Sequence, residues 1–168
     1  KYEMFNRYRD TDHLESAPIL WNKERFSCMD KGYFWLSETP HIQSDGWDEL
    51  KYKRICIWAR LFDRENRKIF NFLNTHYGFG NDCQLKSSDL LIKTVQNMAG
   101  DYTAVTGDFN ATPEAPAYKR LVRYFTDVNA ATAGDFGTTY HNYGKIKVGH
   151  HIDYCFVAGN VKPVKSYI

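Results

Sequence analysis

The chain has 168 residues, enough for one domain with a sizeable core, and no repeat or low-complexity segment divides it, so residues 1–168 are expected to form a single domain. Apolar residues make up 43%, which excludes a disordered chain, and the net charge of +2 is too small to favour nucleic acid as a partner. No apolar run could span a bilayer, and no signal-peptide pattern stands at Lys1. The four cysteines form no CxxC pair, which argues against zinc and mildly favours a reducing compartment such as the cytoplasm.

The first third of the chain predicts short strands separated by turns and loops. Residues 1–15 are polar and without a period, and are predicted to be a loop. Short apolar runs predict strands at residues 17–21, 26–29 and 33–36. A turn is expected at Asp30–Gly32 between the last two runs. The polar stretch 37–53 is a long loop, and loops of this length are often functional.

A hairpin is predicted next. Residues 54–62 alternate, with a common apolar face formed by Ile55, Ile57, Ala59 and Leu61. A charged turn at 63–67 leads to a partner strand at 68–75, which delivers Asn74 and His76 at its end.

The rest of the chain predicts helices alternating with strands. Asn81 and Gln84 resemble a capping box, followed by a helix that Gly100 ends. Pro116 suits the first turn of a second helix, whose predicted face is Tyr118, Leu121, Val122 and Phe125. The remaining segments are predicted as strands at 102–106 and 151–158, a loop at 126–149 and an extended piece at 162–168. Such an α+β pattern predicts sheets that form the core and helices that cover them.

The candidate chemistry centres on the stretch Val105–Pro113, which reads VTGDFNATP. Asp108 and Asn110 follow a strand and are two residues apart, so they would share a face if the strand persisted. A carboxylate beside an amide suits a hard divalent cation and a phosphate oxygen. A simple turn is an equally good interpretation of this stretch alone, because Gly, Asp and Asn all favour turns.

Other polar residues stand where packing would favour an apolar side chain. Asp153 lies inside an otherwise apolar strand, where a buried carboxylate needs a partner, so it is either a structural hydrogen-bond acceptor or an acid that orients a catalytic histidine. His76 alone is more often a structural histidine than a catalyst. Glu15 precedes a strand. His150 and His151 could be a surface pair, and no base accompanies Cys83.

The order of four motifs resembles the endonuclease/exonuclease/phosphatase superfamily. They are FWLSETP at 34–40, LNTH at 73–76, TGDFN at 106–110 and IDY at 152–154. The resemblance implies a four-layer α/β/β/α sandwich of two mixed sheets with outer helices, and hydrolysis of a phosphodiester or phosphomonoester with Mg²⁺ or Mn²⁺.

The resemblance also implies roles for individual residues. Asp108 and Asn110 match the pair that holds the metal, the attacking water and the phosphate. His76 matches the histidine that donates to the phosphoryl oxygens, and Glu15 the acid that orients it. Asp153 matches the acid that orients a second histidine. Two further residues, Arg54 and Asn74, are candidates for contacts with the substrate.

Two motifs of the superfamily are absent from the sequence. They are an early Asn strand followed by Gln-Glu, and a final Ser-Asp-His, so the fold is expected to be incomplete at both ends. The chain is therefore expected to be an internal fragment of a longer enzyme, inactive by itself. His151 is a candidate to replace the missing histidine. The alternative is a binding module that keeps the fold without a complete metal site. The sequence does not identify the substrate or the oligomeric state.

Overall fold

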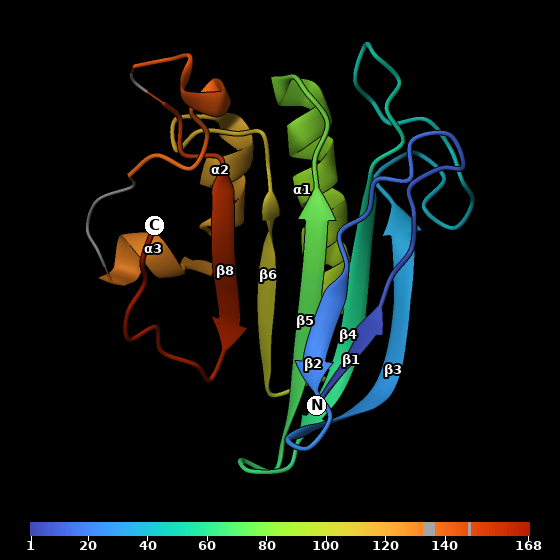
Figure 1. Ribbon diagram of the computed structural model, residues 1–168, viewed down its shortest axis with the longest axis vertical. Helices are drawn as coiled ribbons and strands as arrows, with labels where there is room; N and C mark the ends of the chain where they lie inside the picture. Colours follow the sequence, from blue (N-terminus) through green and yellow to red (C-terminus); the bar gives the residue numbers. More distant parts are fainter. Residues whose placement is uncertain (133–136, 148) are drawn as a thin grey trace.

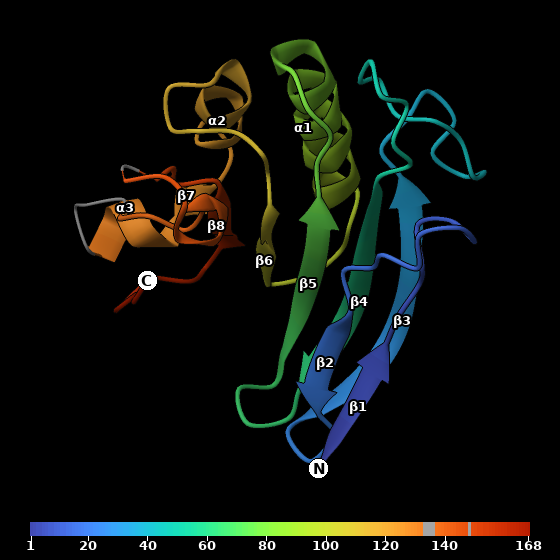
Figure 2. The same cartoon turned by 45° about the horizontal axis from the view of Figure 1, so that its top comes forward.

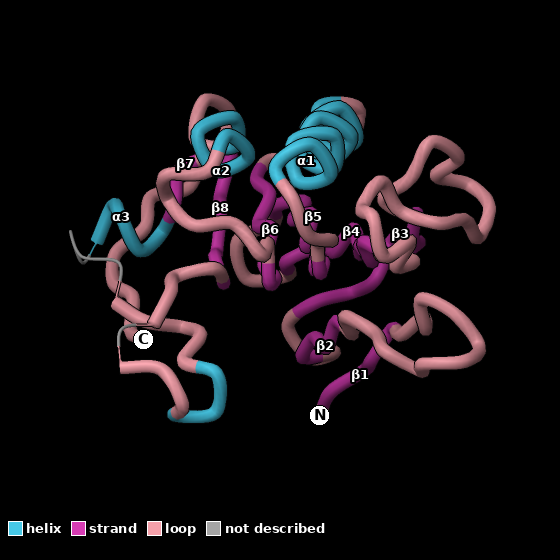
Figure 3. Tube along the Cα trace, turned by 90° about the horizontal axis from the view of Figure 1, so that it is seen from above, coloured by secondary structure: helices cyan, strands magenta, loops and turns pink. Residues whose placement is uncertain are grey.

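The computed structural model describes residues 1–132, 137–147 and 149–168, and its strands form two sheets that lie face to face (Figures 1 and 3). The larger sheet has the strand order β3-β4-β5-β6-β8-β7. Its strands are β3 (Phe26–Trp35), β4 (Ile55–Asp63), β5 (Lys68–His76), β6 (Tyr102–Asp108), β7 (Thr126–Asp127) and β8 (Asp153–Gly159). The smaller sheet pairs β1 (Tyr2–Phe5) with β2 (Ile19–Asn22).

Helices α1 (Asn81–Gln96) and α2 (Pro116–Leu121) cover one face of the larger sheet, and the smaller sheet lies over the other face (Figures 2 and 3). A short helix α3 (Val128–Thr132) and a 3₁₀ turn η1 (Asn142–Gly144) lie within the segment predicted as a loop. The predicted α+β sandwich of two sheets is confirmed. The larger sheet is mixed because β5 and β6 run parallel, and the smaller one is antiparallel.

Two apolar clusters hold these layers together. Between the sheets, the predicted face of β4 is 3% exposed or less and packs with Ile19 and Trp21. Between the larger sheet and the helices, the core includes Leu73, Val105 and Phe156, all fully buried. Full burial of one such side chain contributes about 1.5–3 kcal/mol, so the layers are fixed by packing on both faces of the large sheet.

The N-terminal third contains more strand than the sequence predicted. The loop predicted for residues 1–15 is wrong in part, because Tyr2–Phe5 pairs with Ile19–Asn22. The turn predicted at Asp30–Gly32 is also wrong, since β3 continues along β4 with only a bulge between Cys28 and Asp30. The glycine that suggested a turn is required for packing, because a Cβ on Gly32 would lie 2.7 Å from the Trp58 ring.

Both predicted end signals of the first helix are wrong as well. Asn81 is the first residue of α1 rather than its cap, and the preceding Gly80 makes no side-chain cap. The helix ends at Gln96 with Asn97 as its C-cap, so Gly100 does not end it. The Gln84 amide donates to the Asn110 carbonyl at 2.7 Å and to the Gly78 carbonyl at 3.5 Å. The extended piece predicted at 162–168 forms no strand. None of the helices in the described part of the chain has the length and apolar character needed to cross a membrane.

A buried carboxylate stabilises the larger sheet at the end where β4 turns into β5. Asp63, at the end of β4, is 0% exposed and accepts hydrogen bonds from Arg25 (2.9 Å), Asn66 (2.8 Å) and the Tyr102 hydroxyl (3.1 Å). These donors, Arg25 first, hold the pKa of the Asp63 carboxyl well below its usual range. One side chain thus links the starts of β3 and β6 to the β4–β5 turn.

We expect Asp63→Asn to lower the free energy of unfolding at pH 7 by about 2–3 kcal/mol, because Arg25 loses its charged partner. Since the folded pKa lies below the unfolded one, this stabilisation is present at neutral pH and is lost as the pH falls below about 4. Urea unfolding at several pH values measures it. The matched control is Asp89→Asn, which breaks a half-exposed pair with Arg120 and should change stability by about 0.5 kcal/mol or less. Equal effects of the two variants would contradict the assigned role of Asp63.

Candidate active site

Three titratable residues lie in one row across the larger sheet. The parallel pairing of β5 and β6 sets His76 opposite Asp108, and the antiparallel pairing of β6 and β8 sets Asp108 opposite Asp153. His76 Nε2 lies 3.5 Å from Asp108 Oδ2. Each residue is the last or the first of its strand, so the row stands at one end of the sheet.

A cleft of about 530 Å³ opens over this row. His76, Asp108 and Asp153 line it, together with Asn74 and His151. The segment before β2 and the C-terminal residues 166–168 form its other walls. The cleft therefore lies over the ends of β5, β6 and β8, where side chains from distant parts of the sequence meet.

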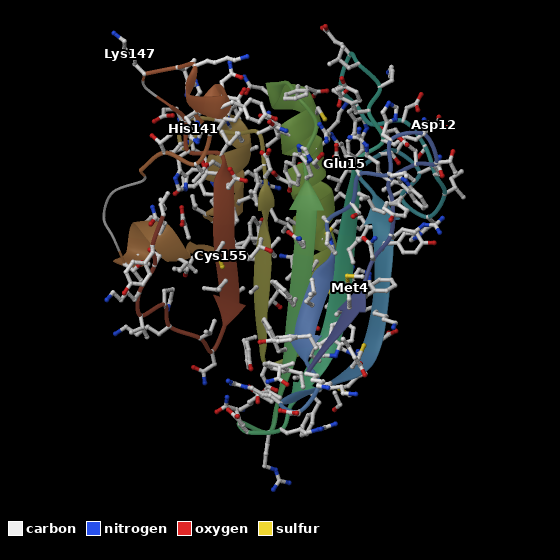
Figure 4. All side chains as sticks on the ribbon, viewed as in Figure 1. Met4, Asp12, Glu15, His141, Lys147 and Cys155 are labelled. Carbon is white, nitrogen blue, oxygen red and sulfur yellow. The ribbon has the colours of Figure 1, made fainter. Side chains whose placement is uncertain are left out.

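Glu15 joins this group from the loop between β1 and β2. Its Oε1 atom lies 2.9 Å from His76 Nδ1, 2.8 Å from Arg54 Nη1 and 2.9 Å from Arg9 Nη1. Figure 4 shows Glu15 near the upper ends of the central strands. Three nitrogen atoms thus converge on one carboxylate oxygen directly behind the row.

The two arginines behind Glu15 are buried. The side chains of Arg9 and Arg54 are 7% and 5% exposed, and both guanidinium groups lie over the Tyr52 ring, at 5.4 and 5.1 Å. Burial lowers the pKa of Arg54, and the nearby charge of Glu15 opposes this shift. Arg54 contacts His76 but does not line the cleft, so its guanidinium is enclosed by protein.

Asn110 holds Asp108 from behind. The strand ends at Asp108, and Asn110 adopts a left-handed φ of 49° instead of continuing the strand face. Its backbone N–H donates to Asp108 Oδ1 at 2.8 Å, and its side-chain amide donates to the Tyr77 carbonyl at 2.9 Å. The chain therefore turns after Asp108, as the simple turn interpretation predicted. The hydrogen bond within that turn fixes the carboxylate of Asp108.

The electrostatics of the row follow from its partial burial. Burial raises the pKa of Asp108, and the charge of Asp153 raises it further against the opposing effects of Asn110 and His76. Burial and the charge of Arg54 lower the pKa of His76, while Asp108 and Glu15 oppose this shift. Both pKa shifts favour the neutral form of the side chain. A cation beside the two carboxylates would favour the charged form of Asp108 instead.

Two assumptions about predicted residues need correction. Asp153 is exposed at the mouth of the cleft, so the expectation of a buried carboxylate is wrong, because β8 begins at this residue. His151 is 5% exposed and packs edge-on against the Tyr154 ring, with 4.7 Å between the ring centroids, so it is not part of a surface pair. Asn74 donates to the Pro18 carbonyl just before β2 and accepts from Thr106 on the neighbouring β6, so it ties the larger sheet to the segment that leads into the smaller one.

No pattern in the sequence pointed to Arg9 as part of the site. It stands in a polar stretch without a period, and only the folded chain places it beside Glu15. Gln84 was noticed, but for the wrong role. Its contact with Asn110 joins residues 26 positions apart, which no local pattern encodes.

The carboxylates at this site suit a divalent cation that is held partly by the protein and partly by the oxygens of a substrate. Within the described residues, no three or more His, Cys, Asp or Glu side chains are grouped to hold a metal by themselves. Mg²⁺ is often bound by one or two carboxylates and completed by water and phosphate oxygens. The neighbouring carboxylates of Asp108 and Asp153 suit that mode of binding.

Comparison with known proteins gives a consistent family match. A sequence model described as the endonuclease/exonuclease/phosphatase family matches residues 20–168. No curated protein matches the chain. An endonuclease/exonuclease/phosphatase from Bacteroides vulgatus is 29% identical with a TM-score of 0.84, over 94% of this chain and 64% of that chain.

Two other solved structures are similar over comparable lengths. A mannosyl-6-phosphatase from Bacteroides thetaiotaomicron is 25% identical with a TM-score of 0.80, over 95% of this chain and 63% of that chain. The human Nocturnin catalytic domain, 16% identical with a TM-score of 0.70 over 94% of this chain and 60% of that chain, shows the fold alone. The chain spans less than two thirds of the length of these structures.

The strands β5 and β6 approach so closely beside the row that a side chain at Gly107 should destabilise the protein. Gly107 has a φ of 152°, and a Cβ there would lie 2.1 Å from the Thr75 carbonyl oxygen. We expect Gly107→Ala to lower the free energy of unfolding by about 3 kcal/mol or more, from backbone strain and the clash. Gly80→Ala is the control, because φ is 88° there but a Cβ would meet nothing within 4 Å. It should lose only about 1 kcal/mol. Similar losses in urea unfolding would show that the strands do not approach so closely.

Proposed function

The chain belongs to the endonuclease/exonuclease/phosphatase family, and on this premise we propose that the protein hydrolyses phosphoester bonds with the help of a divalent metal ion. The observation that carries the proposal is the row of His76, Asp108 and Asp153 along one cleft, with Glu15 behind His76. Hydrolysis of an anionic phosphoester requires neutralised charge and an aligned nucleophile, and this row offers groups for both tasks.

Asp108 is the residue we assign to the attacking water. Its Oδ1 atom is held by the Asn110 backbone, while Oδ2 faces His76. A raised pKa makes Asp108 a better proton acceptor than an ordinary aspartate, so it can take a proton from a water beside the phosphorus. Asn110 keeps this carboxylate in place. Its amide nitrogen already donates to the Tyr77 carbonyl, so we assign only its amide oxygen to the metal, as the family resemblance implies.

Mg²⁺ or Mn²⁺ is the cofactor we propose, held by Asp108 with Asn110 and with the neighbouring carboxylate of Asp153. Such an ion supplies charge neutralisation at the phosphoryl oxygens and lowers the pKa of a bound water. His76 stands 3.5 Å from Asp108 and lines the same cleft, so its ring can donate to a phosphoryl oxygen.

The substrate class is narrowed only by the similar proteins. The mannosyl-6-phosphatase from Bacteroides thetaiotaomicron supports a phosphomonoester, and a cleft of about 530 Å³ has room for a small phosphorylated compound. A phosphodiester stays a candidate, and the net charge of +2 does not favour nucleic acid.

The second candidate function is a binding module that keeps the fold without the reaction. The observation in its favour is that the described residues provide no group of three metal-binding side chains. A module of this kind would bind a phosphorylated compound in the same cleft and leave it intact.

We expect Asp108→Ala and His76→Ala each to lower kcat by about 100-fold or more, because each removes a group at the phosphoryl centre. A phosphomonoester and a phosphodiester should both be tested with Mg²⁺ and Mn²⁺, on this chain and on a longer protein that contains it. Asp89→Ala on the exposed side of α1 is the control and should retain full activity. Full activity in both site variants would exclude the assigned roles.

We expect calorimetry to show binding of Mg²⁺ in the presence of a non-hydrolysable phosphate analogue, and Asp108→Asn to weaken it at least 10-fold, because one carboxylate charge is lost. EDTA should abolish hydrolysis in parallel. Binding of the analogue without any dependence on metal, and with no turnover, would support the binding module instead.

A further inference from the structure

A second hollow, of about 820 Å³, lies on the helix side of the larger sheet. One wall is the side of α1 that runs from Lys86 to Asn97, and the other is the end of β3 with the loop that follows it. That loop rises on the same face of the sheet as α1 (Figure 3). The described residues that line this hollow are all different from those that line the active-site cleft. We call it the α1 groove, and its volume is in the range of ligand pockets.

The first aromatic ring of the α1 groove is Trp58 on β4. Trp58 pairs with Gly32 on β3, and a Cβ on Gly32 would lie 2.7–3.0 Å from three atoms of the indole ring. The ring therefore occupies the space that a side chain would take at position 32. It is partly exposed, and no described residue accepts a hydrogen bond from its ring nitrogen. Trp58 thus offers the groove an apolar ring and a free N–H donor.

The second aromatic ring is Trp47, in the wall formed by the loop after β3. Its ring nitrogen donates to Glu38, which lines the same groove. Trp47 is partly exposed and Glu38 is exposed. A carboxylate has two acceptor oxygens, so Glu38 can accept from a ligand hydroxyl while it holds the indole. The groove therefore contains two indole rings and a carboxylate in a fixed relation to one of them.

Hydrogen bonds within the loop hold this wall in place. The Ser37 and Ser44 hydroxyls are 2.6 Å apart, and the Thr39 hydroxyl donates to Ser44 at 2.8 Å. The Gly46 N–H donates to the Tyr52 carbonyl at 3.0 Å. A wall that is arranged before a ligand arrives lowers the entropic cost of binding.

The charges on the α1 wall are mostly paired within the protein. Lys86 lies 3.0 Å from Asp82, and Asp89 lies 2.7 Å from Arg120. Lys93 has no ion-pair partner among the described residues, and the single carboxylate in the opposite wall balances its charge. The groove as a whole is therefore close to neutral, which does not favour a polyanion or a strongly basic peptide.

We propose that the α1 groove binds a neutral oligosaccharide. A sugar ring presents C–H groups on its faces, which suit an indole surface, and hydroxyls at its edge, which both donate and accept. Trp58 and Trp47 supply the surfaces, and Glu38, Lys93 and Asn97 supply hydrogen bonds. The α1 wall rises about 16 Å from end to end, which is long enough for a short chain of sugar rings. This site is independent of the proposed hydrolysis.

The test is a titration of the 168-residue chain with three trisaccharides, namely maltotriose, cellotriose and α-1,6-linked mannotriose. The readout is the ¹⁵N–¹H NMR signals of the four tryptophan side chains, assigned by substitution. At least one trisaccharide should shift the signals of Trp58 and Trp47. The signals of Trp21 and Trp35 are the internal control and should stay in place, because each of these residues is 4% exposed.

Variants locate the bound sugar. Trp58→Ala and Trp47→Ala should each weaken binding of that trisaccharide by about 10-fold or more, because a stacking surface is lost. Thr94→Phe fills the groove from the α1 wall without removing either indole, and it should weaken binding to a similar extent. Tyr143→Ala is the matched control, since it removes an aromatic ring that is 91% exposed and outside the groove. It should bind as the wild type does.

The wild-type titration and Thr94→Phe decide the question even if a tryptophan variant fails to fold. Absence of any shift at Trp58 with all three trisaccharides would overturn the proposal. A shift at Trp58 with tetralysine or with a short single-stranded DNA, and with none of the sugars, would overturn it in favour of a charged ligand. Because no step of this test needs turnover, a protein without phosphoesterase activity would contradict the proposed function alone.

Discussion

The hydrogen-bond register of three neighbouring strands controls the candidate site. It places His76, Asp108 and Asp153 in one row, and three residues further into the sheet it places Leu73, Val105 and Phe156 in another. This second row is fully buried. A slip of one residue would expose these apolar side chains and turn the polar row to the wrong face, so packing in the core fixes the geometry of the site.

The second constraint is the packing of the two sheets against each other. Glu15 precedes β2, whose Ile19 and Trp21 pack on the apolar face of β4. The Asn74 side chain donates to the Pro18 carbonyl, which fastens the larger sheet to the segment before β2 at the edge of the cleft. The reach of Glu15 to His76 is therefore a consequence of core packing between the sheets and of one hydrogen bond to the segment before β2.

The third constraint is electrostatic. Two buried guanidinium groups share one carboxylate oxygen and one aromatic face, in surroundings where charge interactions are stronger than in water. The planar fork of arginine can contact Glu15 and His76 together while it stacks on Tyr52. Polar groups held in this way are arranged before any ligand arrives, which is the condition for electrostatic stabilisation of developing charge.

The sequence by itself determined the sheet-forming segments, the buried face of β4, the family and the residue types of the row, because alternation and short motifs are local. It did not predict β1 or the continuous β3, whose existence depends on partner strands, and it misjudged the exposure of Asp153. Only the tertiary structure decided that Arg54 is enclosed behind His76 and that Arg9 shares Glu15. Contacts such as Arg54–Glu15 join residues 39 positions apart, and such proximity is set by sheet packing rather than by any neighbouring residue.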